Sequence, residues 1–265
     1  MKHVLTCLSL TALAACEPQV AQPSGGVGES GAPIAAAAPD PAKPFVVSSK
    51  DGLLEFDYGW PAEAAAIPAL DARFRDEMEQ GRTEALATAE DDRALRRTGD
   101  APFNAHMYSR SWTTAGQSPR LLSLISETHF FTGGAHPNHG VDSLLWDRAT
   151  HKEIGVADLF DPPTRFAALV SKPWCDSLNG ERIKKRGEQP KPGEMFWDCP
   201  PLDDLAIVPL DDDKDGLFEG IRFSAAPYVA GPYAEGQYDV DLPVNATLMT
   251  AMRPEYRASF ELQPQ

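Results

Sequence analysis

The first 44 residues combine a short apolar run with a Pro-rich segment that has almost nothing to bury, and they confine folding to the rest of the chain. Val4 to Ala15 is an apolar run of about 12 residues, well short of the roughly 20 that a membrane-spanning helix needs. The run is typical of a secretory signal peptide over residues 1–15. Residues 16–44 contain six prolines and no aromatic side chain, so burial cannot offset the loss of chain entropy. We expect a disordered Pro/Ala-rich tether here and a folded part that begins at Phe45.

The tetrapeptide Leu13-Ala14-Ala15-Cys16 resembles the processing site of bacterial lipoproteins. In such a site the cysteine thiol receives a diacylglycerol and the cysteine becomes the N-terminus. Each buried methylene of an acyl chain contributes about 0.8 kcal/mol, so several chains hold a protein firmly on a bilayer. The resemblance implies lipidation of Cys16, a lipid bilayer as partner, and a place in the bacterial cell envelope facing the periplasm or the outside. The alternative is ordinary secretion with a free Cys16 thiol.

The formal charge of −15 limits the classes of partner. Loss of Lys2 with a signal peptide would make the charge −16. Nucleic acid phosphates would be repelled, so we expect no nucleic acid partner, and anionic lipid would be repelled in the same way. The charge favours a cationic partner, or it serves solubility alone.

Two cysteines, Cys175 and Cys199, lie in the part of the chain that can fold. Both would face an oxidising compartment, and each is close to a tryptophan. Closing the loop between them is worth roughly 3 kcal/mol in the chain-entropy treatment. We predict a structural disulfide, because no C-x-x-C spacing is present to lower the pKa of one thiol for redox work.

Hydrophobic periodicity predicts a small α+β domain over residues 45–140. The expected strands cover residues 45–47, 54–58, 103–113 and 120–131. Between the second and third of these, the pattern from Pro61 to Arg97 predicts a helix, with a break expected at Gly81. Its apolar residues at helical spacing are Ile67, Leu70, Phe74 and Met78. A turn is expected at Thr132-Gly133-Gly134.

A second α+β domain is predicted over residues 141–265. Asp161 would cap its helix, with Pro162 at the first helical position. The buried stripe of that helix would be Phe166, Leu169, Val170, Trp174 and Leu178. The expected strands cover residues 141–146, 205–209, 218–223 and 238–242; an exposed loop is expected at 184–193 and a short helix at 245–252. The fold class is therefore α+β, with two small domains of mainly antiparallel sheet, each packed with one or two helices.

Three blocks of the chain resemble one family of exported bacterial proteins. The blocks are Leu122-Ser123-Leu124 leading to Phe130-Phe131-Thr132-Gly133-Gly134-Ala135-His136-Pro137, then Asp158-Leu159-Phe160, and then Ala226 to Gly236. They are similar to the RsiV-type extracellular domain, of unknown function, preceded by a smaller PdaC/RsiV-associated α+β domain. Relatives include a lysozyme-binding ectodomain of an anti-sigma factor and a non-catalytic region beside peptidoglycan deacetylase domains. The resemblance implies a binding role at the cell envelope.

Three histidines, His129, His136 and His139, form a candidate zinc site, since imidazole is the commonest zinc ligand and a turn would bring them together. No H-E-x-x-H motif or adjacent general base completes a hydrolase site. The other interpretation is a structural Gly-rich turn in which the histidine caps backbone groups.

An acidic segment follows the D-x-D-x-D-G spacing of a calcium loop. Asp211, Asp213 and Asp215 alternate before Gly216, and Glu219 occupies the ninth position. The twelfth position is an arginine, so the bidentate glutamate of a true EF-hand is missing. The segment is therefore either a weak calcium site, the one cofactor that the sequence suggests, or an acidic hairpin turn.

Tyr228 and Tyr233 are candidate ligand-binding residues, because tyrosine often anchors carbohydrate and protein partners; the other interpretation is core packing. No G-x-S-x-G elbow is present and no catalytic residue can be nominated. We therefore expect a non-catalytic binding module for a peptidoglycan fragment or a cationic protein such as lysozyme. The alternative is a metal-assisted hydrolase of cell-wall material.

Overall fold

The computed structural model describes residues 42–263. The predicted signal peptide, Cys16 and most of the predicted tether lie outside the described residues. Among the described residues, the first secondary-structure element begins at Phe45, as expected. Within residues 42–263, no helix is both long enough and apolar enough to cross a bilayer.

A six-stranded sheet forms the first half of the described chain. Its strands lie in chain order: β1 (Phe45–Lys50), β2 (Leu54–Trp60), β3 (His106–Gln117), β4 (Leu121–Phe131), β5 (Asn138–Asp147) and β6 (Lys152–Ile154). Neighbouring strands are antiparallel except β2 and β3, which are parallel. Parallel strands need a long crossover, and the 31-residue helix α2 (Pro68–Thr98) supplies it.

The predicted first helix is broken at a proline and not at Gly81. A short helix, α1 (Ala62–Ala65), ends before Ile67, whose extended backbone leads into Pro68 at the start of α2. A residue before proline disfavours the helical conformation, which explains the break. Helix α2 continues through Gly81 because one internal glycine costs only about 1 kcal/mol.

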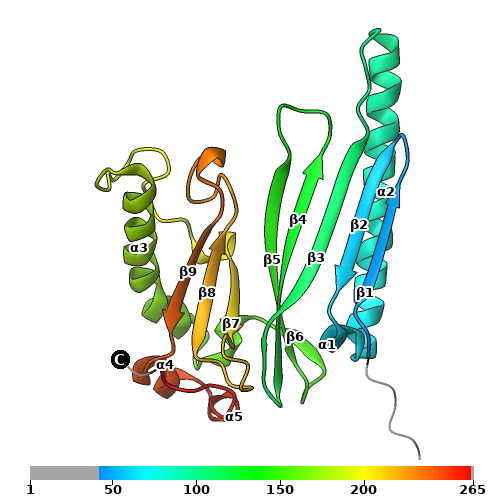
Figure 1. Cartoon of the computed structure of the whole chain (residues 1–265). Helices are drawn as coiled ribbons and strands as arrows, with labels where there is room; N and C mark the ends of the chain where they lie inside the picture. The colour runs from blue at the N-terminus through cyan, green and yellow to red at the C-terminus, as the bar shows by residue number, and fades with distance from the viewer. Residues whose placement is uncertain (1–41, 264–265) are drawn as a thin grey trace, which may run out of the picture. The chain divides into compact units, whose positions relative to one another are not determined.

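The first core lies between α2 and one face of the six-stranded sheet (Figure 1). Phe74 of the predicted stripe is fully buried there and packs against Trp60 and Trp112. Strand β4 is buried on both faces: Leu122 belongs to this core, whereas Leu121 faces the second core. The six-stranded sheet is therefore a middle layer of the described part.

A three-stranded antiparallel sheet forms the next layer. It contains β7 (Ala206–Leu210), β8 (Gly220–Ala225) and β9 (Tyr238–Pro243). Helix α3 (Thr164–Arg186) packs on β9, and β7 contacts β3, β4 and β5, so the order of layers is α2, large sheet, small sheet and α3 (Figure 1). The remaining helical segments are η1 (Val156–Leu159), η2 (Leu202–Asp204), η3 (Tyr233–Glu235), α4 (Ala246–Ala251) and α5 (Pro254–Arg257).

Two local predictions about α3 were wrong. The helix starts at Thr164 with Pro163 at its cap position and no side-chain cap, so Asp161 does not cap it and Pro162 lies before its first residue. Lys184 lies inside the helix, which ends at Arg186 and is followed by Gly187 at the cap position, where a φ of +71° suits a residue without Cβ. The observed loop therefore begins at residue 187, three residues later than the predicted start at residue 184.

The α+β class with mainly antiparallel sheets and a few helices is confirmed. The division into domains at residues 140 and 141 stays a prediction. That point falls within β5, whose residues 138–147 pair with β4. Residues from Pro41 onward cluster as one unit.

Candidate functional site

The three histidines lie on the β4–β5 hairpin. His129 of β4 is directly opposite His139 of β5, with ring centroids 5.4 Å apart. His136 lies in the connecting turn, where its Nδ1 is 2.8 Å from the carbonyl oxygen of Pro137. The hairpin thus places all three rings at one end of the large sheet.

Tyr228 and Tyr233 reach the same place from the loop between β8 and β9. The Tyr233 ring stacks on His136 with centroids 3.9 Å apart, and the Tyr228 ring lies 5.8 Å from Tyr233. The Tyr228 hydroxyl is 3.4 Å from Nε2 of His136. We call the five residues His129, His136, His139, Tyr228 and Tyr233 the His–Tyr patch.

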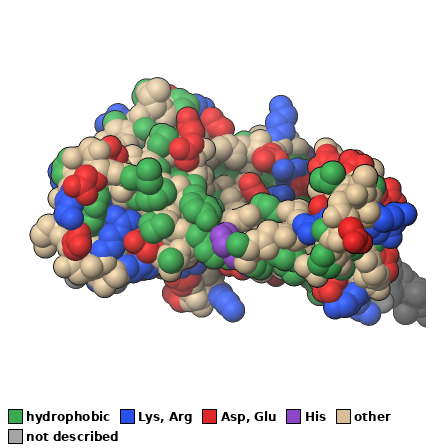
Figure 2. Space-filling model, turned by 90° about the horizontal axis from the view of Figure 1, so that it is seen from above, with side chains coloured by type: hydrophobic (Ala, Val, Ile, Leu, Met, Phe, Trp, Pro, Cys, Tyr) green, Lys and Arg blue, Asp and Glu red, His purple; other side chains and the backbone are tan. Residues whose placement is uncertain are grey.

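The His–Tyr patch is accessible. Tyr228 is 52% exposed, and the other members are half-buried. Figure 2 looks onto this end and shows histidine beside hydrophobic side chains near the centre of the face. The predicted zinc residues and the predicted ligand-binding tyrosines therefore form one surface, a feature that neither motif revealed alone.

The backbone of the β8–β9 loop is shaped to present these rings. Tyr228 has a φ of +71°, which is unfavourable for a residue with a side chain. A Cβ at Gly231 would lie 2.8 Å from Cε2 of Tyr238, so only glycine fits there. Strained backbone next to an exposed ring is common at binding sites, where surrounding contacts hold it in place.

Arg182 of α3 anchors this loop from below. Its side chain is fully buried, and its Nε and Nη2 donate to the carbonyl oxygen of Ala230 at 3.0 and 2.8 Å. Nη1 also donates to Asn179 Oδ1 and to the carbonyl oxygen of Trp197, and Nη2 to that of Asp198. Burial, and then the charge of neighbouring Arg186, lower the pKa of Arg182. A buried cation needs such full hydrogen bonding to be tolerated.

One helical turn later, Arg186 forms a bidentate ion pair with Glu235, with both N–O distances 2.8 Å. The Tyr238 hydroxyl donates to the same carboxylate at 2.5 Å. The hydrogen bonds from Arg186, against the opposing effect of burial, hold the pKa of Glu235 below its ordinary value. Burial and the contact with Glu235 raise the pKa of Tyr238 to about 12. Sequence reasoning missed this network, although arginines four residues apart on one helix face were a visible signal.

The predicted disulfide joins the same region. Cys175 of α3 and Cys199 are bonded, with Cα atoms 5.6 Å apart. The bond fixes the segment that provides the carbonyl oxygens of Trp197 and Asp198 to Arg182. Helix α3, this segment and the β8–β9 loop thus support the His–Tyr patch together.

A polar cleft of about 270 Å³ lies between the two sheets next to the patch. Its lining residues are Ser111, Thr113, Ile125, Glu127, Arg222, Gln237 and Asp239. Glu127 also lies 3.8 Å from Nε2 of His129, which connects the cleft to the patch. Hydroxyl, amide and carboxylate groups therefore border the aromatic surface.

The described structure does not bring the three histidines together as a metal group. Among residues 42–263, the one set of three candidate ligands whose atoms all lie within 4.8 Å of one another is Asp211, Asp213 and Asp215. Burial and the adjacent His129 lower the pKa of His139, and its ring is tilted against those of His129 and Tyr233. The histidines are arranged as an aromatic surface.

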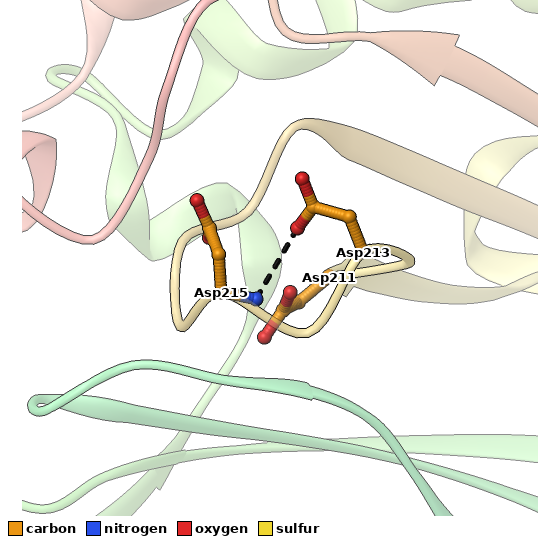
Figure 3. A group of neighbouring side chains, drawn as sticks. All are labelled: Asp211, Asp213 and Asp215. Atoms are coloured by element: carbon orange, nitrogen blue, oxygen red, sulfur yellow. Dashed lines mark hydrogen bonds between the residues drawn. The ribbon is translucent and has the colours of Figure 1, made fainter.

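The acidic loop between β7 and β8 is a separate feature (Figure 3). Asp213 and Asp215 are exposed, whereas Asp211 and Glu219 are buried. The Glu219 carboxylate accepts from the backbone N–H of Asp212 at 2.8 Å and lies outside the three-aspartate set.

Residues 47–139 match the protein family described as Deacetylase PdaC. This match confirms the resemblance of the first predicted domain, whereas the RsiV-type assignment of the second stays a prediction. No curated protein matches the chain.

The chain is also similar to two solved structures of DUF3298 family proteins. One, from Pseudomonas aeruginosa PAO1, has 18% sequence identity and a TM-score of 0.47, covering 84% of this chain and 99% of that chain. The other, from Bacteroides fragilis NCTC 9343, has 15% identity and a TM-score of 0.47, covering 82% and 95%.

Proposed function

We propose that the chain is a non-catalytic binding module of the bacterial cell envelope, and that the His–Tyr patch binds a glycan-containing peptidoglycan fragment. One observation carries the proposal: two tyrosine rings and a histidine ring lie stacked on an accessible surface. Rings of this kind offer a flat apolar face with polar edges. A sugar ring has the same combination of one apolar face and surrounding hydroxyl groups.

The support beneath the rings strengthens the proposal. Arg182, the Arg186–Glu235 ion pair and the disulfide hold the loop in place before any ligand arrives. A preorganised surface loses less conformational entropy when it binds. The adjoining cleft adds hydroxyl and amide groups, such as Thr113 and Gln237, that suit sugar hydroxyls.

Anchoring through an acylated Cys16 belongs to the same proposal. It would keep the module next to the cell wall, with a tether of residues 16–44 giving it reach. Mass spectrometry of protein from bacterial membranes tests this part. A fatty-acylated N-terminal Cys16 supports it, and an unmodified chain that starts at Met1 contradicts it.

A cationic protein such as lysozyme is the second candidate partner. The formal charge of −15 favours it, because opposite charge speeds encounter. Calorimetry at low and high salt tests this candidate, which predicts binding that weakens as salt rises. Absence of binding at low ionic strength would exclude lysozyme.

A metal-assisted hydrolase is the alternative, and the family description as a deacetylase is the observation that favours it. Replacing His136 by Ala separates the two functions. A binding module loses affinity for the fragment and has no turnover to lose, whereas an enzyme loses turnover with its fold intact. Release of acetate or of shortened fragments by the wild type would contradict our proposal.

Titration calorimetry with purified soluble peptidoglycan fragments tests the patch itself. Tyr228→Ala and Tyr233→Ala should each weaken binding about two- to tenfold, since one stacked ring is worth about 0.5–1.5 kcal/mol. Phe130→Ala is the matched control, because Phe130 is an exposed ring next to His129 on β4 that points to the opposite face of the sheet. Equal affinity of the tyrosine variants and the Phe130→Ala control for the fragment would contradict the proposal.

A further inference from the structure

We propose that the β7–β8 loop, residues 211–219, is a calcium site that holds the two sheets together. Asp211, Asp213 and Asp215 would provide its carboxylate ligands. This inference is independent of the function proposed for the His–Tyr patch, which lies at a different place in the fold.

The three carboxylates already converge. One oxygen of each lies within 4.8 Å of the others, and Figure 3 shows Asp211 inside the curve of the loop, between Asp213 and Asp215. Gly216 follows with a φ of +92°, which only glycine adopts without strain. Alternate aspartates followed by glycine are the arrangement with which calcium loops surround a hard cation.

Two buried carboxylate oxygens at this loop have no hydrogen-bond partner in the described part of the chain. They are Oδ1 of Asp211 and Oε2 of Glu219, and each of these residues is only 7% exposed. The other Asp211 oxygen accepts from the N–H of Gly216 at 3.2 Å. An unpaired buried acceptor is costly, and buried charges are normally paired or coordinate a metal. A divalent cation would satisfy the Asp211 oxygen and balance the charge of Glu219.

The negative charge around the loop also favours a bound cation. Within residues 42–263, no Lys, Arg or His side chain forms an ion pair with Asp211, Asp213, Asp215 or Glu219. Glu261 adds another carboxylate: partial burial and the charges of Asp215 and Asp213 raise the pKa of Glu261. Like charges that no ion pair neutralises repel one another, so a bound cation relieves this repulsion.

The ligand chemistry selects calcium over magnesium and predicts modest affinity. All the ligands are carboxylate oxygens, which suit calcium because it accepts irregular coordination, whereas magnesium demands a near-ideal octahedron. The twelfth loop position is Arg222, which forms a bidentate pair with Asp241 and cannot replace the usual glutamate. We therefore expect a Kd of about 10⁻⁴–10⁻³ M, as in extracellular calcium modules.

The loop contacts both the large sheet and the C-terminal segment. The N–H of Asp211 donates to the carbonyl oxygen of Ala115 at 3.2 Å, and a Cβ at Gly116 would lie 2.7 Å from the Asp211 Cβ. On the other side, the N–H of Phe218 donates to the carbonyl oxygen of Ser259 at 2.9 Å. Calcium that stiffens this loop therefore stabilises the contact between the sheets.

Equilibrium dialysis of the purified, EDTA-treated protein measures the site directly. We expect one calcium ion per chain in the stated range. With a Kd of about 0.5 mM, 10 mM calcium increases the folding constant about 20-fold, which raises Tm by roughly 4–7 °C for a chain of this size. Magnesium at 10 mM should raise Tm by less.

Asp213→Asn/Asp215→Asn is the test variant, since both side chains are exposed and asparagine keeps their hydrogen-bond acceptors. It should fold like the wild type by circular dichroism and lose the calcium response. Asp203→Asn/Asp204→Asn removes the same charge from an exposed acidic pair outside the loop and should keep the response. No bound calcium in the wild type, or an equal response in the two double variants, would overturn the proposal.

Discussion

Replacing Arg182 by Ala should destabilise the protein more than any surface substitution on the same helix. Arg182 is fully buried, and its loss leaves the buried carbonyl oxygen of Trp197 without its donor. The carbonyl oxygen of Ala230 loses both Arg182 donors and keeps only the longer hydrogen bond from Nη2 of Arg186, at 3.4 Å. Each orphaned buried acceptor costs about 1–3 kcal/mol. Removal of a poorly solvated cation offsets part of that cost, so we expect a net loss of roughly 3–5 kcal/mol, typical of breaking a buried charged network.

Urea denaturation followed by tryptophan fluorescence measures this loss. The midpoint should fall while the m-value stays constant, and Tm should fall by roughly 6–20 °C. Arg165→Ala is the matched control, because Arg165 lies exposed on α3. Arg182→Lys should lie between the two, since an ammonium offers three donors and no planar fork. If Arg182→Ala changes stability by no more than Arg165→Ala, the anchoring role is refuted.

Three further predictions concern the same support. Arg186 lowers the folded pKa of Glu235 from its usual 4.5, so the Arg186–Glu235 ion pair stabilises the folded protein above about pH 4.5 and loses this effect as pH falls through the lowered pKa. Between pH 6 and pH 3, the Tm of Glu235→Gln should therefore fall less steeply than that of the wild type. An equal slope in the two proteins contradicts this prediction. Replacing Cys175 and Cys199 by Ser should cost about 3.5 kcal/mol for a loop of 24-residue separation, or roughly 10 °C in Tm by calorimetry. Gly231→Ala should lower the free energy of unfolding, measured by urea titration, by about 1–3 kcal/mol because the added Cβ would crowd the Tyr238 ring. Wild-type stability of this variant would show that the loop can move to accommodate the Cβ.

Local periodicity predicted most of the elements. The alternation in Tyr238–Pro243 appears as strand β9 with every second side chain buried, and Phe166, Val170, Trp174 and Leu178 are the buried stripe of α3. These patterns predict structure reliably because the side of a strand or helix on which a residue lies is set by its spacing from residues only a few positions away. The break in the first helix was predicted at Gly81 and falls instead before Pro68, although a proline disfavours helix in the residue before it and so carried the signal.

The candidate site could be predicted only in pieces. Tyr228 and His136 are 92 residues apart in sequence, and no spacing rule connects a hairpin turn to a distant loop. The burial of Arg182 was equally hidden, because an arginine on a helix is normally exposed and only the folded carbonyl groups explain it. The Asp211 spacing was visible, whereas its buried, unpartnered oxygen depends on packing against Gly116.

The most direct test of the central proposal is an NMR titration of the histidine ring resonances with soluble peptidoglycan fragments. The chain has six histidines, and three of them belong to the His–Tyr patch. Signals of His129, His136 and His139 should shift in a saturable manner, while His106, buried under α2, and His151 should not. Saturable shifts confined to His106 or His151, or no shift at millimolar fragment, would contradict the proposal.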